Sequence, residues 1–449
     1  MKITIPQDVK VIAHIFKNHG YQCFVVGGAV RDSILKRHPE DWDLATDALP
    51  LDIVKLFKAV IPTGIEHGTV TIRWKGKSYE TTTFRIEKEY SDARHPDTVL
   101  FTNSLHEDLA RRDFTINSLA ADPFSGSVID YFDGIKDLKS RIIRAVGNPE
   151  ERFNEDALRT LRAIRFAGVL QFSIEPSTYS AIKTALSNIP KLSIERIREE
   201  FSKLMLSPKP SYPLLMLEET GLMKFIIPEY LACKNITQGS MHRYDVSRHL
   251  LASCDAAPGN LIARLAALLH DIAKPLCRVE KNNELTFYGH DKASAEMAKI
   301  ILTRLKYPNH VIEKICIIIE NHMVFYNDFW TDGAVKRFIR RLGIENLENF
   351  FMLKVADAAG MSGCAPDIRT VKHFYDRVYK IIHEKHALSL KDLAVNGNDL
   401  IALGYKKGPV VGKVLQELLE TVLDDPSVNT RERLLSIATL LRDKYTSDQ

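Results

Sequence analysis

Several features that mark common protein classes are missing from this chain of 449 residues. Its six cysteines are scattered and form no Cys-x-x-Cys pair, so neither a disulfide framework nor a zinc knuckle is indicated. No apolar run approaches the ~18–20 residues of a membrane span, and no apolar signal-peptide core is present in the first residues, MKITIPQDVK. We therefore expect a protein of the reducing cytoplasm with no membrane partner.

The chain also lacks a strong excess of either charge. It contains 61 Lys and Arg against 57 Asp and Glu, a net charge of +4, so any RNA-binding surface must be a local patch. We find no low-complexity segment and no repeat of fixed period. The length exceeds that of one ordinary hydrophobic core, and we expect about two to four domains.

A glycine turn near the N-terminus has the properties of a phosphate-binding element. The apolar run 23–26 ends at Gly27 and Gly28, and a helical pattern follows over 29–36, which predicts a strand, a tight turn and a helix. Because glycine has no Cβ, a triphosphate could approach the backbone N–H groups at the start of that helix. Arg31 would add a charged fork to the same anion.

A pair of carboxylates follows about ten residues later. Asp41 and Asp43 lie two positions apart, so on a strand they would project from the same face. Two adjacent carboxylates repel each other unless a cation lies between them, and hard oxygen ligands of this kind suit Mg²⁺. Alone, either the Asp-x-Asp pair or the Gly-Gly turn is more often an ordinary strand end or turn.

Together, the strings GGAVRD and DWDLATDA resemble the class II tRNA nucleotidyltransferase and poly(A) polymerase family. The resemblance implies an α+β fold, in which a DNA polymerase β-like head with a mixed sheet is followed by an all-α neck, body and tail. It implies that Asp41 and Asp43 are catalytic and hold Mg²⁺. It also places Gly27, Gly28 and Arg31 at the nucleotide.

Two later segments could complete the head. Glu80 lies in the strand-like run SYETTTF and is a candidate third catalytic carboxylate, although a strand Glu also often faces solvent. Residues 85–101 are polar and charged without an apolar period, which predicts a mobile loop, and the family has a flexible loop there. A passive surface connection is the alternative.

The run RRDFTIN contains Arg112 and Asp113 and would, in isolation, indicate a helix cap with terminal charges. It resembles the family motif RRDFTxN, which implies that Arg112 and Asp113 contact the ribose and phosphates of the incoming nucleotide. The same role for Arg111 is left open.

A helical motif, EDALRTLRAIRF, places charged residues on one side and apolar residues on the other. Such a stripe is ordinarily a solvated face. Asp can instead accept from an exocyclic amine, and Arg can donate two coplanar hydrogen bonds to a base edge. The motif resembles the family's EDxxR element, which implies that the protein itself selects CTP or ATP through Asp156, Arg159, Arg162 and Arg165.

A second chemical centre is predicted in the C-terminal half, where a strongly apolar helix ends in His270-Asp271. Burying such a pair without partners costs ~1–3 kcal/mol per group, and a metal supplies partners. The set resembles the H…HD…D ligands of HD-superfamily phosphohydrolases: His249, His270, Asp271 and Asp357. Imidazole ligands favour a transition metal such as Ni²⁺, Mn²⁺ or Co²⁺. His290 and His322 could bind a second metal or a substrate phosphate.

The run LGYKKGPVVGK near the C-terminus resembles the tail of family members that grips tRNA, and an ordinary helix connection is the alternative. We predict these domains: head 1–145, neck with the nucleotide-selecting helix 146–207, body 208–240, HD domain 241–385 and tRNA-binding helical tail 386–449.

The predicted function is template-independent addition of CCA to tRNA 3′ ends, with CTP, ATP and Mg²⁺. An enzyme that adds only A, one that adds only CC, a poly(A) polymerase, and a nucleotide phosphohydrolase with a retired head remain alternatives. The full-length segment 85–101 argues against the CC-only enzyme.

Overall fold

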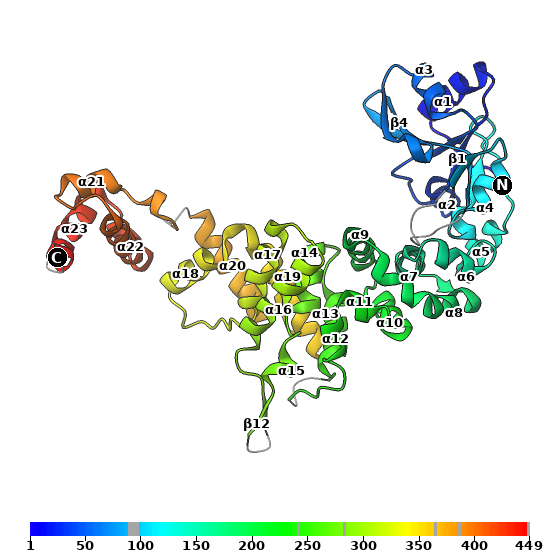
Figure 1. Ribbon diagram of the computed structural model, residues 1–449. Helices are drawn as coiled ribbons and strands as arrows, with labels where there is room; N and C mark the ends of the chain where they lie inside the picture. The colour runs from blue at the N-terminus through cyan, green and yellow to red at the C-terminus, as the bar shows by residue number, and fades with distance from the viewer. Residues whose placement is uncertain (89–97, 240–242, 282–283, 363–365, 385–387, 447–449) are drawn as a thin grey trace. The chain divides into compact units, whose positions relative to one another are not determined.

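The computed structural model describes the chain except residues 89–97, 240–242, 282–283, 363–365, 385–387 and 447–449 (Figure 1). The chain forms two compact units, Met1–Leu231 and Ala232–Gln449. Within the described residues, no helix is both long and apolar enough to cross a membrane.

The first unit is built on a mixed sheet of seven strands in the order β3-β4-β5-β2-β1-β8-β9. Strand β1 is antiparallel to both β2 and β8, whereas β2 and β5 are parallel. The strands are β1 (Cys23–Val26), β2 (Leu44–Thr46), β3 (Val60–Gly64), β4 (Thr69–Trp74), β5 (Lys77–Thr83), β8 (Leu119–Ala121) and β9 (Val128–Asp130). The predicted α+β head with a mixed sheet is confirmed.

Helices surround this sheet and continue beyond it. Helix α1 is amphipathic and buries Val9, Ile12 and Phe16. The helices associated with the sheet are α1 (Gln7–Asn18), α2 (Gly28–Ile34), α3 (Pro50–Leu56), α4 (Leu105–Ala110) and α5 (Gly134–Ser140). The helices that follow are α6 (Pro149–Glu155), α7 (Leu158–Leu170), α8 (Pro176–Thr184), α9 (Ile194–Met205), α10 (Ser211–Thr220), α11 (Met223–Ile226) and α12 (Pro228–Leu231). Between them, β10 (Ile142–Ile143) and β11 (Ser173–Ile174) form a short parallel pair.

Three local predictions need correction. The strand expected to contain Asp41 begins only at Leu44, although the Val26 N–H donates to the Asp43 carbonyl at 3.0 Å and keeps Asp43 beside β1. The expected helix through EDALR is interrupted at Asp156, which has extended backbone and whose carboxylate accepts from the Leu158 N–H at 3.1 Å. A short polar side chain that competes for backbone N–H groups in this way ends one helix and starts another.

The third correction concerns the loop predicted over 85–101. Its two ends are paired antiparallel strands, β6 (Arg85–Lys88) and β7 (Thr98–Phe101). Residues 89–97 lie outside the described part of the chain.

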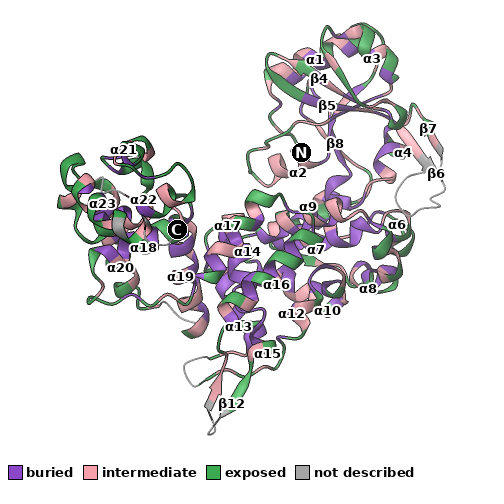
Figure 2. Cartoon of the chain, turned by 60° about the vertical axis from the view of Figure 1, so that its left-hand side comes forward, coloured by how far each residue is buried: buried purple, intermediate pink, exposed green. Residues whose placement is uncertain are grey.

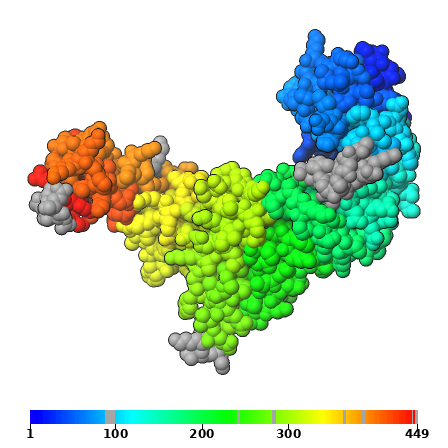
Figure 3. Space-filling view, viewed as in Figure 1, coloured from blue at the N-terminus to red at the C-terminus, as the bar shows by residue number. Residues whose placement is uncertain are grey.

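The second unit is mainly helical. A two-stranded ladder, β12 (Val279–Lys281) with β13 (Glu284–Thr286), projects from its helices (Figures 1 and 3). The helices are α13 (Val246–Ala256), α14 (Leu261–Leu269), α15 (Lys274–Cys277), α16 (His290–Arg304), α17 (Asn309–Glu320), α18 (Asp332–Leu342), α19 (Leu347–Ser362), α20 (Arg369–His383), α21 (Gly397–Ala402), α22 (Pro409–Asp424) and α23 (Arg431–Thr446).

Helix α14 is the buried centre of this unit, and its residues from Ala263 to Leu269 are buried without exception (Figure 2). Helices α13 and α19 pack closely because Gly360 has no side chain. A Cβ at Gly360 would lie 2.1 Å from Ser253 Oγ on α13. This approach brings His249 on α13 near Asp357 on α19.

Candidate active site and candidate metal centre

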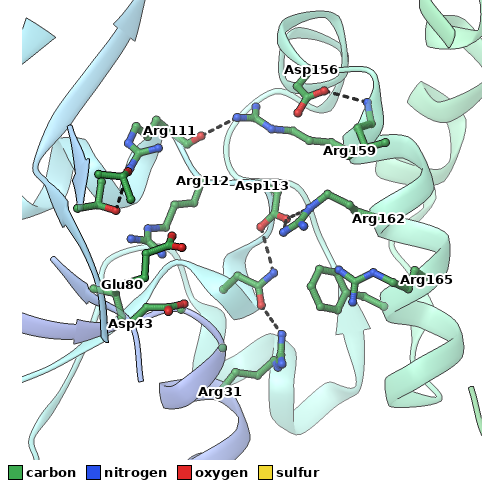
Figure 4. A pocket seen from close by; sticks show the side chains of 18 of the residues that line it. Arg31, Asp43, Glu80, Arg111, Arg112, Asp113, Asp156, Arg159, Arg162 and Arg165 are labelled. Atoms are coloured by element: carbon green, nitrogen blue, oxygen red, sulfur yellow. Dashed lines mark hydrogen bonds and ion pairs between the residues drawn. The ribbon is translucent and has the colours of Figure 1, made fainter. Parts of the chain in front are cut away.

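A pocket of about 560 Å³ lies within the first unit and is lined by residues of the sheet, of α7 and of α9. Figure 4 shows Asp43 and Glu80 on one side of it and Arg162 and Arg165 on the other. Its lining contains eight arginines and four carboxylates. The arginines are Arg31, Arg85, Arg111, Arg112, Arg159, Arg162, Arg165 and Arg196, and the carboxylates are Asp43, Glu80, Asp113 and Asp156. This excess of positive charge and this volume suit a polyanion of the size of a nucleoside triphosphate.

Two carboxylates from neighbouring strands meet at the pocket. Asp43 immediately precedes β2 and Glu80 lies on β5, which pairs with β2. Burial, the nearby Glu80 and the nearby Asp41 raise the pKa of Asp43 to about 6, although Arg112 opposes the shift. Asp41 itself is exposed and is not among the described residues that line the pocket. A buried carboxylate whose pKa is raised by neighbouring carboxylates is a good fit for a divalent cation.

The glycine turn lies directly beside Arg112. Gly27 has a φ of +68°, which favours glycine, and a Cβ there would lie 3.1 Å from Arg112 Nη1. Arg112 donates from Nη2 to Asp108 at 3.2 Å, and its buried Nε has no hydrogen-bond partner among the described residues. Arg31 donates to Asn117 at 2.7 Å and pairs with Asp32 at 2.9 Å. Both arginines are therefore oriented before any anion binds.

Asp113 is held in a network of its own. Arg162 donates from Nε and Nη2 to one of its oxygens at 2.8 and 2.6 Å, and Asn117 donates to the other at 3.0 Å. Although burial favours the neutral acid, these partners hold the pKa of Asp113 at about 2. The carboxylate therefore orients Arg162 in addition to any contact it makes with a nucleotide.

The predicted base-reading residues all line the pocket, but each already has protein partners. Arg159 donates to Glu155 at 2.6 Å and to the Arg111 carbonyl at 2.9 Å. Asp156 pairs with Arg196 of α9 at 2.8 Å. These contacts fix the direction in which each polar group faces.

Sequence reasoning did not assign two residues of α9 to this site. Glu200 is 5% exposed and accepts from Arg165 at 2.5 Å, and its other oxygen lies 3.6 Å from Arg162. Arg196 holds Asp156. In the sequence both residues belong to an ordinary amphipathic helix. The only sign of a role in the site was that Glu200 falls on the buried face of this helix and that Arg196 lies one turn before it. Their partners lie 35 and 40 positions earlier in the chain.

In the second unit, four predicted ligands converge. The Nε2 atoms of His249 and His270 lie 3.0 Å apart. An Asp271 oxygen lies 3.3 Å from each of them, and an Asp357 oxygen lies 3.2 and 3.4 Å from them. Donor atoms about 2.1 Å from one metal ion lie roughly 3.0 Å apart at 90° and roughly 3.4 Å apart at a tetrahedral angle. The spacing therefore fits a single metal ion.

A second group shares Asp271. Its other oxygen lies 3.2 Å from His290 Nε2 and 3.5 Å from His322 Nε2. This oxygen and His290 Nε2 are buried and have no hydrogen-bond partner among the described residues. Each of the two histidines donates from Nδ1 to a backbone carbonyl, which turns Nε2 toward the shared carboxylate.

The charges of this cluster favour a cation. Burial opposes the protonation of His270, but Asp271 and Asp357 raise its pKa to about 10. Burial also favours the neutral form of Asp271, yet His270 and Lys274 lower its pKa. Lys274 lies 2.6 Å from Asp271 and donates to Gln238 at 2.6 Å. Positive charge at the centre of the cluster is thus strongly stabilised.

The mixed sheet with its glycine turn, paired carboxylates and arginine-lined pocket defines a nucleotidyltransferase. Residues 23–144 match the family described as "Poly A polymerase head domain". Residues 171–233 match "Probable RNA and SrmB- binding site of polymerase A", and residues 285–438 match "tRNA nucleotidyltransferase domain 2 putative".

Similar proteins identify the family within the nucleotidyltransferases. The chain is 35% identical to the CCA-adding enzyme of Levilactobacillus brevis, with 97% of this chain and 98% of that protein covered. It is 33% identical to that of Enterococcus faecalis, with 99% of each covered. The chain belongs to the family of CCA-adding enzymes.

A solved structure agrees with this assignment. The CCA-adding enzyme of Bacillus stearothermophilus in complex with CTP superimposes with a TM-score of 0.74 over 99% of each chain, at 29% identity. That of Thermotoga maritima complexed with tRNA_CCA shares the fold, with a TM-score of 0.55 at 20% identity over 96% of this chain and 94% of that chain. Membership of this family implies a divalent metal ion at the nucleotidyl-transfer site, and the carboxylates described above fit one.

Proposed function

We propose that this protein adds C, C and A to the 3′ ends of tRNA without a nucleic-acid template, using CTP and ATP. The observation that carries the proposal is the single pocket that contains both the carboxylates Asp43 and Glu80 and the side chains able to read a base. Solved structures of similar proteins in complex with CTP, ATP and tRNA_CCA support it.

Mg²⁺ is the proposed metal, held by Asp43 with Asp41 and Glu80. When bound there, it would lower the pKa of the RNA 3′-hydroxyl and stabilise the leaving pyrophosphate. Gly27 and Gly28 leave room for the triphosphate at the backbone, and Arg31 and Arg112 neutralise its charge.

The base would be selected by the protein. We assign Asp156 as the acceptor for an exocyclic amine, and Arg159, Arg162 and Arg165 as donors, or supports of donors, to the ring edge. Asp113 holds Arg162 through two hydrogen bonds, and α9 holds Asp156 and Arg165. Because the hydrogen-bonding groups of this surface are fixed, they can pair with only a few arrangements of donors and acceptors on a base. This restriction would be the basis of selection between CTP and ATP.

Three tRNA transcripts test this function: one without CCA, one ending in CC and one ending in CCA, each incubated with CTP, ATP or both. A CCA-adding enzyme extends the first transcript by CCA, the second by A and the third not at all. Extension of the second transcript alone would identify an A-adding enzyme. Extension that stops at CC, or a long run of A on the third, would identify a CC-adding enzyme or a poly(A) polymerase.

The domain division predicted above is retained as a proposal, with the tail 386–449 as the part that grips tRNA. Lys406, Lys407 and Lys413 flank the start of α22 and supply its positive charge. We propose the cytoplasm as the location, on the grounds given by the sequence.

We propose a second activity, phosphohydrolysis of a phosphate ester, for the cluster in the second unit. It is supported by the four donor atoms spaced 3.0 to 3.4 Å apart. Ni²⁺, Mn²⁺ or Co²⁺ is the proposed metal, and when bound it would activate a water for attack on phosphorus. Hydrolysis of p-nitrophenyl phosphate and of 2′,3′-cyclic AMP, assayed with each metal, tests this activity directly.

A further inference from the structure

One aromatic side chain in the pocket is surrounded by three guanidinium groups. Phe166 lies on α7, is 5% exposed and lines the pocket. The Arg165 guanidinium carbon is 3.8 Å from the centroid of its ring. The corresponding distances are 5.1 Å for Arg31 and 5.4 Å for Arg162.

The ring links two parts of the site that are far apart in the sequence. Arg31 comes from α2, beside the glycine turn, whereas Arg162 and Arg165 come from α7. Phe166 also makes an edge contact with Phe114, the residue after Asp113, at 5.8 Å between centroids. Both arginine sets therefore pack on one ring that is itself fixed by its neighbour.

A ring holds these cations in a way that a carboxylate cannot. Three positive groups at one place repel one another, and the negative face of an aromatic ring offsets part of that repulsion. The ring has no net charge. It therefore attracts guanidinium groups without neutralising them and without repelling the phosphates of an incoming nucleotide.

We propose that Phe166 is a positioning residue for nucleotide binding, which keeps the guanidinium groups of Arg31, Arg162 and Arg165 assembled for the anion. The inference rests on the proposed nucleotide addition, because that activity defines the nucleoside triphosphate as the ligand. Phe166 itself makes no hydrogen bond to a nucleotide. Its effect is to reduce the reorganisation that binding requires.

The test compares three variants of the full chain. Phe166→Leu removes the ring and keeps an apolar side chain, whereas Phe166→Tyr keeps the ring. Phe172→Leu is the matched control, because Phe172 is 4% exposed, lies two residues after the end of α7 and is not among the residues that line the pocket. For each variant, KM and kcat for CTP and ATP are measured with tRNA, and inorganic tripolyphosphate is titrated as a base-free probe.

We expect Phe166→Leu to raise KM for both nucleotides and to weaken tripolyphosphate binding, each by about tenfold, with a smaller change in kcat. Phe166→Tyr should keep KM and the affinity for tripolyphosphate close to those of the wild type. Phe172→Leu should lower the melting temperature to a similar extent and leave KM unchanged.

Two results would overturn the inference: wild-type KM and tripolyphosphate binding in Phe166→Leu, or the same rise in KM in Phe172→Leu. The second would show that any packing defect near α7 disturbs the pocket. If the wild-type protein binds tripolyphosphate but extends no tRNA, the proposed function is contradicted and the role of the ring is not. In that case the tripolyphosphate affinities of the three variants still decide the role of the ring.

Discussion

Arg196 on α9 donates two hydrogen bonds to the Asp156 carboxylate, from Nη2 to Oδ2 at 2.8 Å and from Nη1 to Oδ1 at 3.3 Å. Asp156 lies at the break between α6 and α7 and has extended backbone, so a regular helix does not fix the direction of its side chain. The direction of this carboxylate therefore depends on a residue of another helix. This dependence extends the proposed base-reading site beyond the EDALR motif.

The first prediction follows from this pair. Arg196→Met should alter the ratio of kcat/KM for CTP and ATP by about tenfold, while total incorporation falls less, because the loss of one charged hydrogen-bond pair is worth about 1.5–3 kcal/mol. Asp156→Ala should change the ratio in the same way. Competition between CTP and ATP on a tRNA lacking CCA measures it, with Lys203→Met, an exposed position on α9, as the control. Equal slowing with both nucleotides would contradict the assignment.

The second prediction separates chemistry from stability at Asp43. Asp43→Asn should abolish nucleotide incorporation without lowering the melting temperature, because burial and Glu80 raise the pKa of Asp43 to about 6 and disfavour its charged form. In EDTA, the wild type should lose stability relative to Asp43→Asn as the pH rises from about 4 through 6. Adding Mg²⁺ should raise the melting temperature of the wild type only. A large loss of stability in Asp43→Asn would show that the carboxylate is structural.

The third prediction concerns Asp113, whose charged form stabilises the fold, in contrast to that of Asp43. The folded-state pKa of Asp113 is about 2, below its ordinary value of 3.8, so the charged carboxylate stabilises the fold above pH 4 and this contribution is lost as the pH falls toward 2. Asp113→Asn should therefore lower the free energy of unfolding by about 2 kcal/mol at pH 7. Urea unfolding at several pH values should show this difference shrinking below pH 4. A difference that is independent of pH would mean that the ion pair with Arg162 is not its source.

The fourth prediction concerns the second unit. His270→Ala should abolish the proposed binding of a transition metal and the proposed hydrolysis of phosphate esters, and should leave CCA addition in Mg²⁺ nearly intact, because no residue of the first-unit pocket is altered. Metal content by mass spectrometry and both activities are measured together. Asp357→Asn, at a carboxylate that is 17% exposed, guards against misfolding of the buried His270 variant. His310→Ala, at an exposed histidine of α17, is the control.

Either of two results would contradict this fourth prediction. Absence of hydrolysis by the wild type with every metal would mean that the cluster only braces the helices around it. Loss of nucleotide addition in Asp357→Asn with a normal melting temperature would mean that the two centres are coupled.

The site elements that are continuous in the chain were predicted from the sequence. A strand, a glycine turn and a helix occur over 23–34, because an apolar run, two glycines and a helical pattern each favour one local structure. The HD-like ligands were also predicted, and the structure brings His249, His270, Asp271 and Asp357 together. The buried polar pair at the end of an apolar helix was the physical signal for His270 and Asp271, whereas His249 and Asp357 were predicted from the resemblance to HD-superfamily phosphohydrolases.

Other features depended on contacts that no local pattern contains. The sequence assigned Asp156 to a helix, but its side chain accepts from the Leu158 N–H and ends α6 instead. It treated 85–101 as one loop, but strand pairing between Arg85–Lys88 and Thr98–Phe101 needs only a partner strand, and each strand has only four residues, too few to stand out as a period within a mainly polar segment.

The sequence by itself determined which residues are candidates for the chemistry, because the order of its glycines, carboxylates and arginines resembles that of a known family. Only the tertiary structure decided how those groups are held. Asp43 has its raised pKa because β5 brings Glu80 beside it, and Asp156 and Arg165 face the pocket because Arg196 and Glu200 approach from α9. Electrostatic interactions depend on distance and burial in the folded chain, and neither is encoded by the residues next to a charged group.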